Sequence, residues 1–130
     1  MDTPIGRLDV AALDCPDAHA LATFYQAIIG GEVLSHDDDA QWVEVHTDAG
    51  RIAFQQIENY RAPTWPEGPV PQQAHLDIYV ADLDTGEAAV LGLGATKADV
   101  QPSPEDFRVF FDIAGHPFCL VGSTMESPPA

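Results

Sequence analysis

Basic residues are scarce in this chain. Its 130 residues include 5 Lys and Arg against 21 Asp and Glu, which gives a formal net charge of −16. A surface with this charge repels the phosphates of nucleic acids and the anionic headgroups of membranes. Because no basic stripe interrupts the acidic surplus, we expect neither nucleic acid nor a membrane as a partner.

Long apolar runs and cysteine motifs are also missing. No segment is apolar over the length of a bilayer-spanning helix, and the N-terminus does not resemble a secretion signal, so the sequence predicts a cytoplasmic protein. Cys15 and Cys119 have neither CxxC nor zinc-type spacing, which predicts two free thiols. Hydrophobic residues make up 45% of the chain, enough for one compact domain.

What the chain does contain is an internal repeat at an offset of 65 residues. The matched pairs are Val10 with His75, Asp17 with Asp82, Trp42 with Phe107, Ala49-Gly50 with Ala114-Gly115 and, after one deletion, Phe54-Gln55 with Phe118-Cys119. A long fixed period indicates one supersecondary unit that occurs twice and buries its apolar face against its copy. We therefore expect the functional site in the groove between the copies.

Hydrophobic periodicity predicts the same element order, strand, helix and three strands, in both copies. The first copy has it over 8–13, 17–29, 32–35, 41–46 and 51–57, and the second over 75–80, 82–93, 95–100, 107–112 and 117–121. Asp17 is the expected N-cap of the first helix, and Gly30-Gly31 its end. One domain would thus span 1–122, with modules at about 7–57 and 74–122, a proline-rich connector or lid at 58–73 and a frayed tail at 123–130.

The segments LDCPDAHALATFYQAIIGGEV and HLDIYVADLDTGEAAVLGLGA, with the closing DIAGHPFCLV, resemble the vicinal oxygen chelate superfamily. Within it the chain is similar to glyoxalase-like domains of the glyoxalase, bleomycin resistance and dioxygenase family. The resemblance implies an α+β fold in which two βαβββ modules pair, each with an incomplete barrel groove, and a homodimer. It leaves the reaction open, because the superfamily includes isomerases, dioxygenases, thiol transferases and metal-free binding proteins.

The resemblance also implies four inward positions for metal ligands, which the repeat maps to Val10, Gln55, His75 and Cys119. Val10 cannot coordinate a metal, Gln55 offers a neutral carbonyl oxygen, and His75 is a good ligand. Cys119 replaces the Glu that supplies charge and base function in many family enzymes. These departures argue against an extradiol dioxygenase and against a glyoxalase I mechanism.

Strand register leaves a second metal arrangement open. A slip of one residue would turn Asp9 inward in place of Val10, and Asp9 with His75 and Asp77 would form a more metal-like cluster. Purely structural roles are open too, with His75 hydrogen-bonded to Gln55 or Asp77 and Cys119 as a small buried apolar residue. The acidic run at 36–39 is typical of a solvated turn.

Aromatic residues predict a pocket for a planar or amphipathic small molecule. Alternation puts Phe107 and Phe111 on one face of their strand and Phe110 on the other, without telling which face is inward. The other aromatic candidates are Trp42 and Tyr79 on strands and Tyr60 and Trp65 on the connector.

Two main hypotheses follow, and the sequence does not decide whether the protein is an enzyme. The first is a bleomycin resistance-like protein that needs no cofactor and binds an apolar or aromatic compound, either neutral or cationic. Its ligand-binding residues would be His75, Gln55, Trp42, Asp77, Tyr79 and Cys119. The second is a metal-dependent lyase or isomerase in which His75, Gln55 and Cys119, or nearby Asp residues, hold Zn, Ni, Mn or Fe. A third option is an interaction module with a vestigial pocket.

Overall fold

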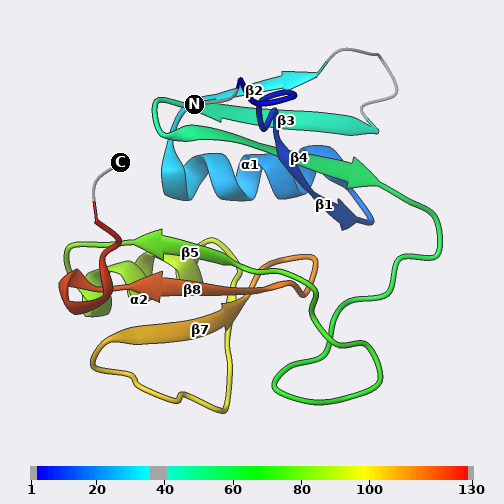
Figure 1. Cartoon of the computed structure of the whole chain (residues 1–130). Helices are drawn as coiled ribbons and strands as arrows, with labels where there is room; N and C mark the ends of the chain where they lie inside the picture. The colour runs from blue at the N-terminus through cyan, green and yellow to red at the C-terminus, as the bar shows by residue number, and fades with distance from the viewer. Residues whose placement is uncertain (1–2, 36–40, 129–130) are drawn as a thin grey trace. The chain divides into compact units, whose positions relative to one another are not determined.

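The structure is a computed structural model that describes residues 3–35 and 41–128, so the turn predicted at 36–39 lies outside the described residues. The chain divides into two compact units, Met1–Glu58 and Asn59–Ala130. Each unit has one four-stranded mixed sheet and one helix packed on one face of that sheet (Figure 1). The predicted α+β fold of two βαβββ modules is confirmed.

The first unit contains one helix and four strands in the predicted order. These are β1 (Ala11–Cys15), α1 (Ala18–Ile29), β2 (Glu32–Ser35), β3 (Trp42–Thr47) and β4 (Gly50–Gln56). The strands lie side by side in the order β1-β4-β3-β2, with β1 parallel to β4 and the other pairs antiparallel. The first strand begins at Ala11 rather than at the predicted Leu8, whose side chain is exposed.

Local sequence explains where α1 begins and ends. The Asp17 side chain accepts a hydrogen bond from the Ala20 backbone N–H, as predicted for an N-cap, and Gly30 ends the helix at a φ of 78°. The buried side of α1 packs on the sheet, where the Tyr25 and Phe54 rings stack with centroids 5.5 Å apart. Val43 and Val45 of β3 are fully buried on this same side.

The second unit repeats the order and adds a short helical turn. It contains β5 (Leu76–Tyr79), α2 (Leu83–Gly92), β6 (Thr96–Lys97), β7 (Phe107–Phe111), β8 (Pro117–Val121) and the 3-10 helix η1 (Ser123–Met125). The strand order is β5-β8-β7-β6, and β5 is parallel to β8. Asp82 caps α2 by accepting from the backbone N–H groups of Asp84 and Thr85. No described helix combines the length and the apolar character that crossing a bilayer requires.

Two segments of the second unit differ from the prediction. The strand expected over 95–100 is only the two residues of β6. Beyond it the Ala98 N–H still donates to the Val109 carbonyl of β7, and the Gln101 side chain then bonds to both the N–H and the carbonyl of Val109. The tail expected to be frayed begins with η1 instead. There the Thr124 hydroxyl donates to Asp106 at 2.7 Å, and this bond and one from Ser103 lower the pKa of the Asp106 carboxyl.

The strand register corrects the way the two halves were matched. Trp42 lies opposite Gln55, and Phe107 lies opposite Val121, so the structural counterpart of Gln55 is Val121 and not Cys119. By the same register Cys119, which lies opposite Val109, corresponds to Ala53. Between matched ladder positions, the connection from Phe111 to Pro117 is one residue longer than the equivalent connection from His46 to Arg51, whereas the sequence comparison assumes a deletion there.

Candidate functional site

A cavity of about 300 Å³ lies on the face of the second sheet that points away from α2. All of its lining residues belong to the second unit. They come from β5, β7 and β8, from the segment before β5, from the loop before β7 and from η1. Its mainly apolar walls include Trp65, Pro102, Phe107, Val109, Val121 and Met125.

The apolar walls follow from alternation along β7. Phe107 and Val109 line the cavity, and Phe111 packs with them against the same buried cluster. Phe110 points to the opposite side, where its ring lies 5.7 Å from that of Phe118. The predicted grouping of Phe107 and Phe111 against Phe110 is therefore confirmed, and the structure identifies the cavity side as that of Phe107.

Three polar side chains lie together at one end of the cavity. His75, Asp77 and Cys119 each offer one potential ligand atom, and these atoms all lie within 4.8 Å of one another. Asp77 lies on β5, and His75 immediately precedes that strand. Because the two residues are two positions apart, their side chains share a face. Asp77 lies opposite Cys119 in the β5–β8 ladder. The His75 and Asp77 side chains are 41% and 55% exposed, whereas Cys119 is buried.

Asp77 lies close to the other two groups of this cluster. Its Oδ1 atom is 3.1 Å from His75 Nε2, a distance at which the carboxylate forms an ion pair with a protonated imidazole. Burial, together with the charge and hydrogen bond of Asp77, raises the pKa of the Cys119 thiol to about 12. Cys119 is thus a protonated donor to Asp77 at neutral pH.

Gln72 also lines the cavity and was not identified from the sequence. Its Oε1 atom is buried and has no hydrogen-bond partner among the residues that the structure describes. A buried acceptor without a partner costs free energy, about 1–3 kcal/mol. No sequence motif marks Gln72, because it lies in the irregular segment before β5, where periodicity carries no information.

The remaining predicted site residues lie elsewhere. Gln55 and Trp42 are neighbours across β4 and β3 of the first unit, and the side chain of Gln55 is not among those that line the cavity. Tyr79 is 44% exposed and does not line the cavity either. Of the six residues predicted to bind a ligand, the cavity contains His75, Asp77 and Cys119.

The first unit has a polar cluster of its own that the sequence reasoning missed. The Trp42 indole N–H donates to Glu44 Oε2 at 2.7 Å, and His46 Nε2 lies 2.6 Å from Glu44 Oε1. The three residues alternate along β3 with the buried Val43 and Val45, so they share the face away from α1. Trp42 was predicted as a ligand-binding aromatic residue, but Glu44 and His46 were not, although the alternation in WVEVH places all three on one face of the strand.

The second metal arrangement considered from the sequence required Asp9 to point inward. Asp9 precedes β1, its side chain is 71% exposed, and it lies 3.7 Å from the Arg51 guanidinium in the same unit. Val10 is half-buried. Within the described part of the chain, the potential metal cluster that includes His75 and Asp77 is completed by Cys119 and not by Asp9.

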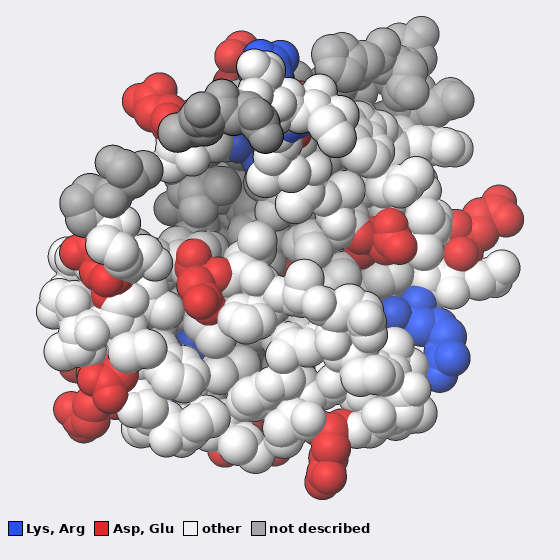
Figure 2. Space-filling view, in the orientation of Figure 1, with Lys and Arg blue, Asp and Glu red and all other residues white. Residues whose placement is uncertain are grey.

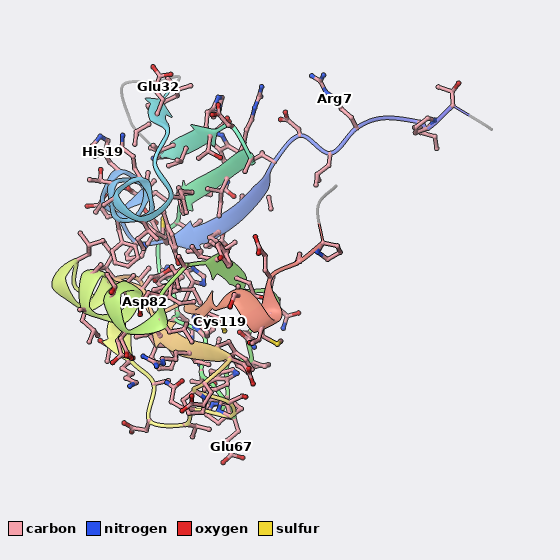
Figure 3. The ribbon with its side chains drawn as sticks, turned by 90° about the vertical axis from the view of Figure 1, so that its left-hand side faces the viewer. Arg7, His19, Glu32, Glu67, Asp82 and Cys119 are labelled. Atoms are coloured by element: carbon pink, nitrogen blue, oxygen red, sulfur yellow. The ribbon has the colours of Figure 1, made fainter. Side chains whose placement is uncertain are left out.

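Charge is distributed as the composition suggested. Acidic side chains are scattered over the surface in view and basic ones are few (Figure 2). Among the described residues that line the cavity there is no Lys or Arg. Figure 3 shows Cys119 on its strand and Asp82 where α2 begins. The site is therefore an apolar cavity with one acidic, hydrogen-bonding end.

Two βαβββ units of this kind define the class of the glyoxalase/bleomycin resistance fold. The model of the glyoxalase-like domain family matches residues 10–121, and the chain belongs to this family of the vicinal oxygen chelate superfamily. A comparison with curated proteins found no significant match.

Solved structures agree with this fold. The fosfomycin resistance protein FosX from Listeria monocytogenes is 17% identical with a TM-score of 0.69, and the match covers 96% of this chain and 97% of FosX. FosX from Mesorhizobium loti is 18% identical with a TM-score of 0.67 and coverage of 94% and 95%. A glyoxalase/bleomycin resistance protein/dioxygenase family enzyme from Burkholderia phytofirmans is 14% identical with a TM-score of 0.65 and coverage of 88% and 96%. At these identities the similarity concerns the fold alone.

Proposed function

We propose that this protein binds a small apolar or aromatic molecule in the cavity of its second unit. The observation that carries the proposal is the cavity itself, whose Trp65, Phe107 and Val109 walls meet the polar end formed by His75 and Asp77. Pockets that combine apolar walls with a few polar groups are typical of small-molecule sites. A volume of about 300 Å³ is at the small end of the range for such sites.

Titration with the neutral fluorescent probe N-phenyl-1-naphthylamine tests the proposal. We expect saturable binding to the wild-type chain, because the probe is aromatic and uncharged. Met125→Phe narrows the cavity and should weaken binding, whereas Val100→Phe, on an exposed residue outside the cavity, should leave it unchanged. Absence of saturable binding, or equal binding by both variants, would overturn the proposal.

A second candidate function is a metal-dependent lyase or isomerase, and the cluster of His75, Asp77 and Cys119 favours it. An imidazole, a carboxylate and a thiolate make a donor set suited to Zn²⁺. Asp77 takes the place that the sequence gave to Gln55. When bound, the metal would polarise an oxygen of the ligand. The residues fit on one condition, that the metal displaces the proton of a thiol whose pKa is raised to about 12.

Metal analysis separates the two candidates. One tightly held transition metal per chain in protein purified without chelators, absent from His75→Ala but present in His19→Ala, would support the second candidate. His19 is the matched control because it is an exposed histidine on α1. A melting temperature that does not change with Zn²⁺, Ni²⁺, Co²⁺ or Mn²⁺ would instead favour metal-independent binding.

The homodimer implied by the resemblance stays a prediction. Light scattering coupled to size exclusion tests it, with an expected mass of twice the 14.0 kDa of one chain. A mass of one chain at micromolar concentration would contradict it.

A further inference from the structure

The polar end of the cavity presents a carboxylate to a ligand. One oxygen of Asp77 lies 3.1 Å from His75 Nε2, and the other oxygen of this half-exposed side chain is an acceptor for a ligand donor. Because carboxylate oxygens only accept, a ligand group placed here needs N–H or O–H groups to bond to it.

Gln72 adds an acceptor from the cavity wall. Its Oε1 atom is buried and has no partner in the described part of the structure. A ligand donor that reaches this oxygen after a rotation of the amide would make a hydrogen bond that the free protein lacks. Such a bond would favour binding, because the free protein already carries the cost of the unpaired acceptor.

The formal charge of the cavity points in the same direction. Among the described lining residues, Asp77 is the one carboxylate and there is no Lys or Arg to pair with it. The Asp77 side chain is 55% exposed, so it is accessible to a ligand. A partner that is both positively charged and rich in N–H groups satisfies charge and hydrogen bonding together.

We infer that the cavity recognises the protonated primary or secondary amine of an aromatic or apolar compound, through N–H donation to the Asp77 carboxylate. This inference rests on the proposed binding function and narrows it to one ligand class. It is more specific than attraction of a cation by an acidic protein, since a quaternary ammonium carries the same charge but has no N–H to donate.

Three probes with one aromatic body test the inference on the wild-type chain. They are 2-phenylethylamine, its N,N,N-trimethyl derivative and 2-phenylethanol, each titrated calorimetrically at neutral pH. We expect the amine to bind about tenfold more tightly than either of the others, the difference typical of one charge-assisted hydrogen bond. Equal binding of the amine and the trimethyl compound, or of the amine and the alcohol, would overturn the inference.

Substitution of the carboxylate supplies the second test. Asp77→Asn should remove the preference for the amine over the trimethyl compound, whereas Asp99→Asn, the same change at an exposed residue outside the cavity, should keep it. A preference that persists in Asp77→Asn would come from the size of the methyl groups and would overturn the inference. The probe comparison in the wild-type chain decides the question if Asp77→Asn does not fold.

Failure of this inference is distinguishable from failure of the proposed function. If N-phenyl-1-naphthylamine binds and none of the three phenylethyl probes does, or they bind equally, the cavity binds apolar molecules and the amine preference is wrong. If neither the naphthylamine nor any phenylethyl probe binds, both proposals are wrong.

Discussion

Asp77 and Cys119 lie directly opposite each other across the parallel β5–β8 ladder, and the thiol is hydrogen-bonded to the carboxylate. This relationship makes the cysteine a donor at the polar end of the cavity. It also keeps the thiol protonated, because a thiolate in this position would be both poorly solvated and next to a negative charge. The reactivity of Cys119 follows from this pairing.

We predict that Cys119 is nearly inert toward alkylation. With its pKa raised to about 12, on the order of one thiol in 10,000 is ionised at about pH 8, and the thiolate is the reactive form. Iodoacetamide labelling in a Cys15→Ala background should therefore be much slower than that of a free cysteine. Asp77→Asn should accelerate it several-fold by removing the neighbouring charge. Rapid labelling of the folded chain would contradict the protonated state.

Alkaline pH should destabilise the protein through the same thiol. The folded state holds the Cys119 proton more tightly than the unfolded chain, whose thiol has an ordinary pKa of 9.0. The resulting stabilisation is complete below pH 9 and is lost as the pH rises toward 12. Urea unfolding from about pH 8 to about pH 11 should show a smaller loss of unfolding free energy in Cys119→Ala than in the wild type.

The control for this pH experiment is Val121→Ala, which shortens a cavity side chain on the same strand without removing a titratable group. It should keep the alkaline loss of the wild type. Identical pH profiles for Cys119→Ala and the wild type would show that the thiol contributes nothing to the alkaline transition.

The two helix caps should contribute comparably to stability. Asp17 accepts from one backbone N–H at the start of α1, and Asp82 accepts from two at the start of α2. Asp17→Ala and Asp82→Ala should each lower the free energy of unfolding by about 1 kcal/mol. Chemical denaturation measures this loss, with Asp99→Ala as an exposed control expected to stay within about 0.5 kcal/mol of the wild type. Losses no larger than that of the control would be inconsistent with capping.

The stacked rings of Tyr25 and Phe54 should dominate the stability of the first unit. Both side chains are fully buried between α1 and its sheet, so Phe54→Ala leaves a cavity that the surroundings refill only in part. We expect it to lower the free energy of unfolding by about 3–5 kcal/mol in urea titrations. Ile113→Ala, on a side chain that is 46% exposed, should cost much less. Equal losses would mean that the stack is not a core contact.

Much of the fold could be predicted from local pattern. Helix boundaries followed from Asp17, Asp82 and Gly30, because capping depends on a few adjacent residues. Strand faces followed from alternation, as the opposite orientations of Phe107 and Phe110 confirm. These features are encoded within a few residues of where they act.

What was missed depends on contacts between distant segments. The predicted match of Gln55 with Cys119 was wrong by two residues. An error of two residues leaves each side chain on the same face of the sheet but moves it by about 7 Å along the strand. Phe54 and Phe118 both face their helices, so the apolar pattern fitted either register. Gln72 and Met125 reach the cavity from irregular segments, for which alternation makes no prediction.

The longer turn between β7 and β8 has a consequence for anyone who would engineer this protein. A side chain of one half cannot be transplanted to the other by adding a constant to its number, because the offset changes at that turn. Rebuilding the cluster of the second unit in the first requires Val10→His, Ala12→Asp and Ala53→Cys, as strand partnership dictates. Gln55, which the sequence comparison matched with Cys119 after one deletion, would hold its new side chain one pleat repeat too far along β4.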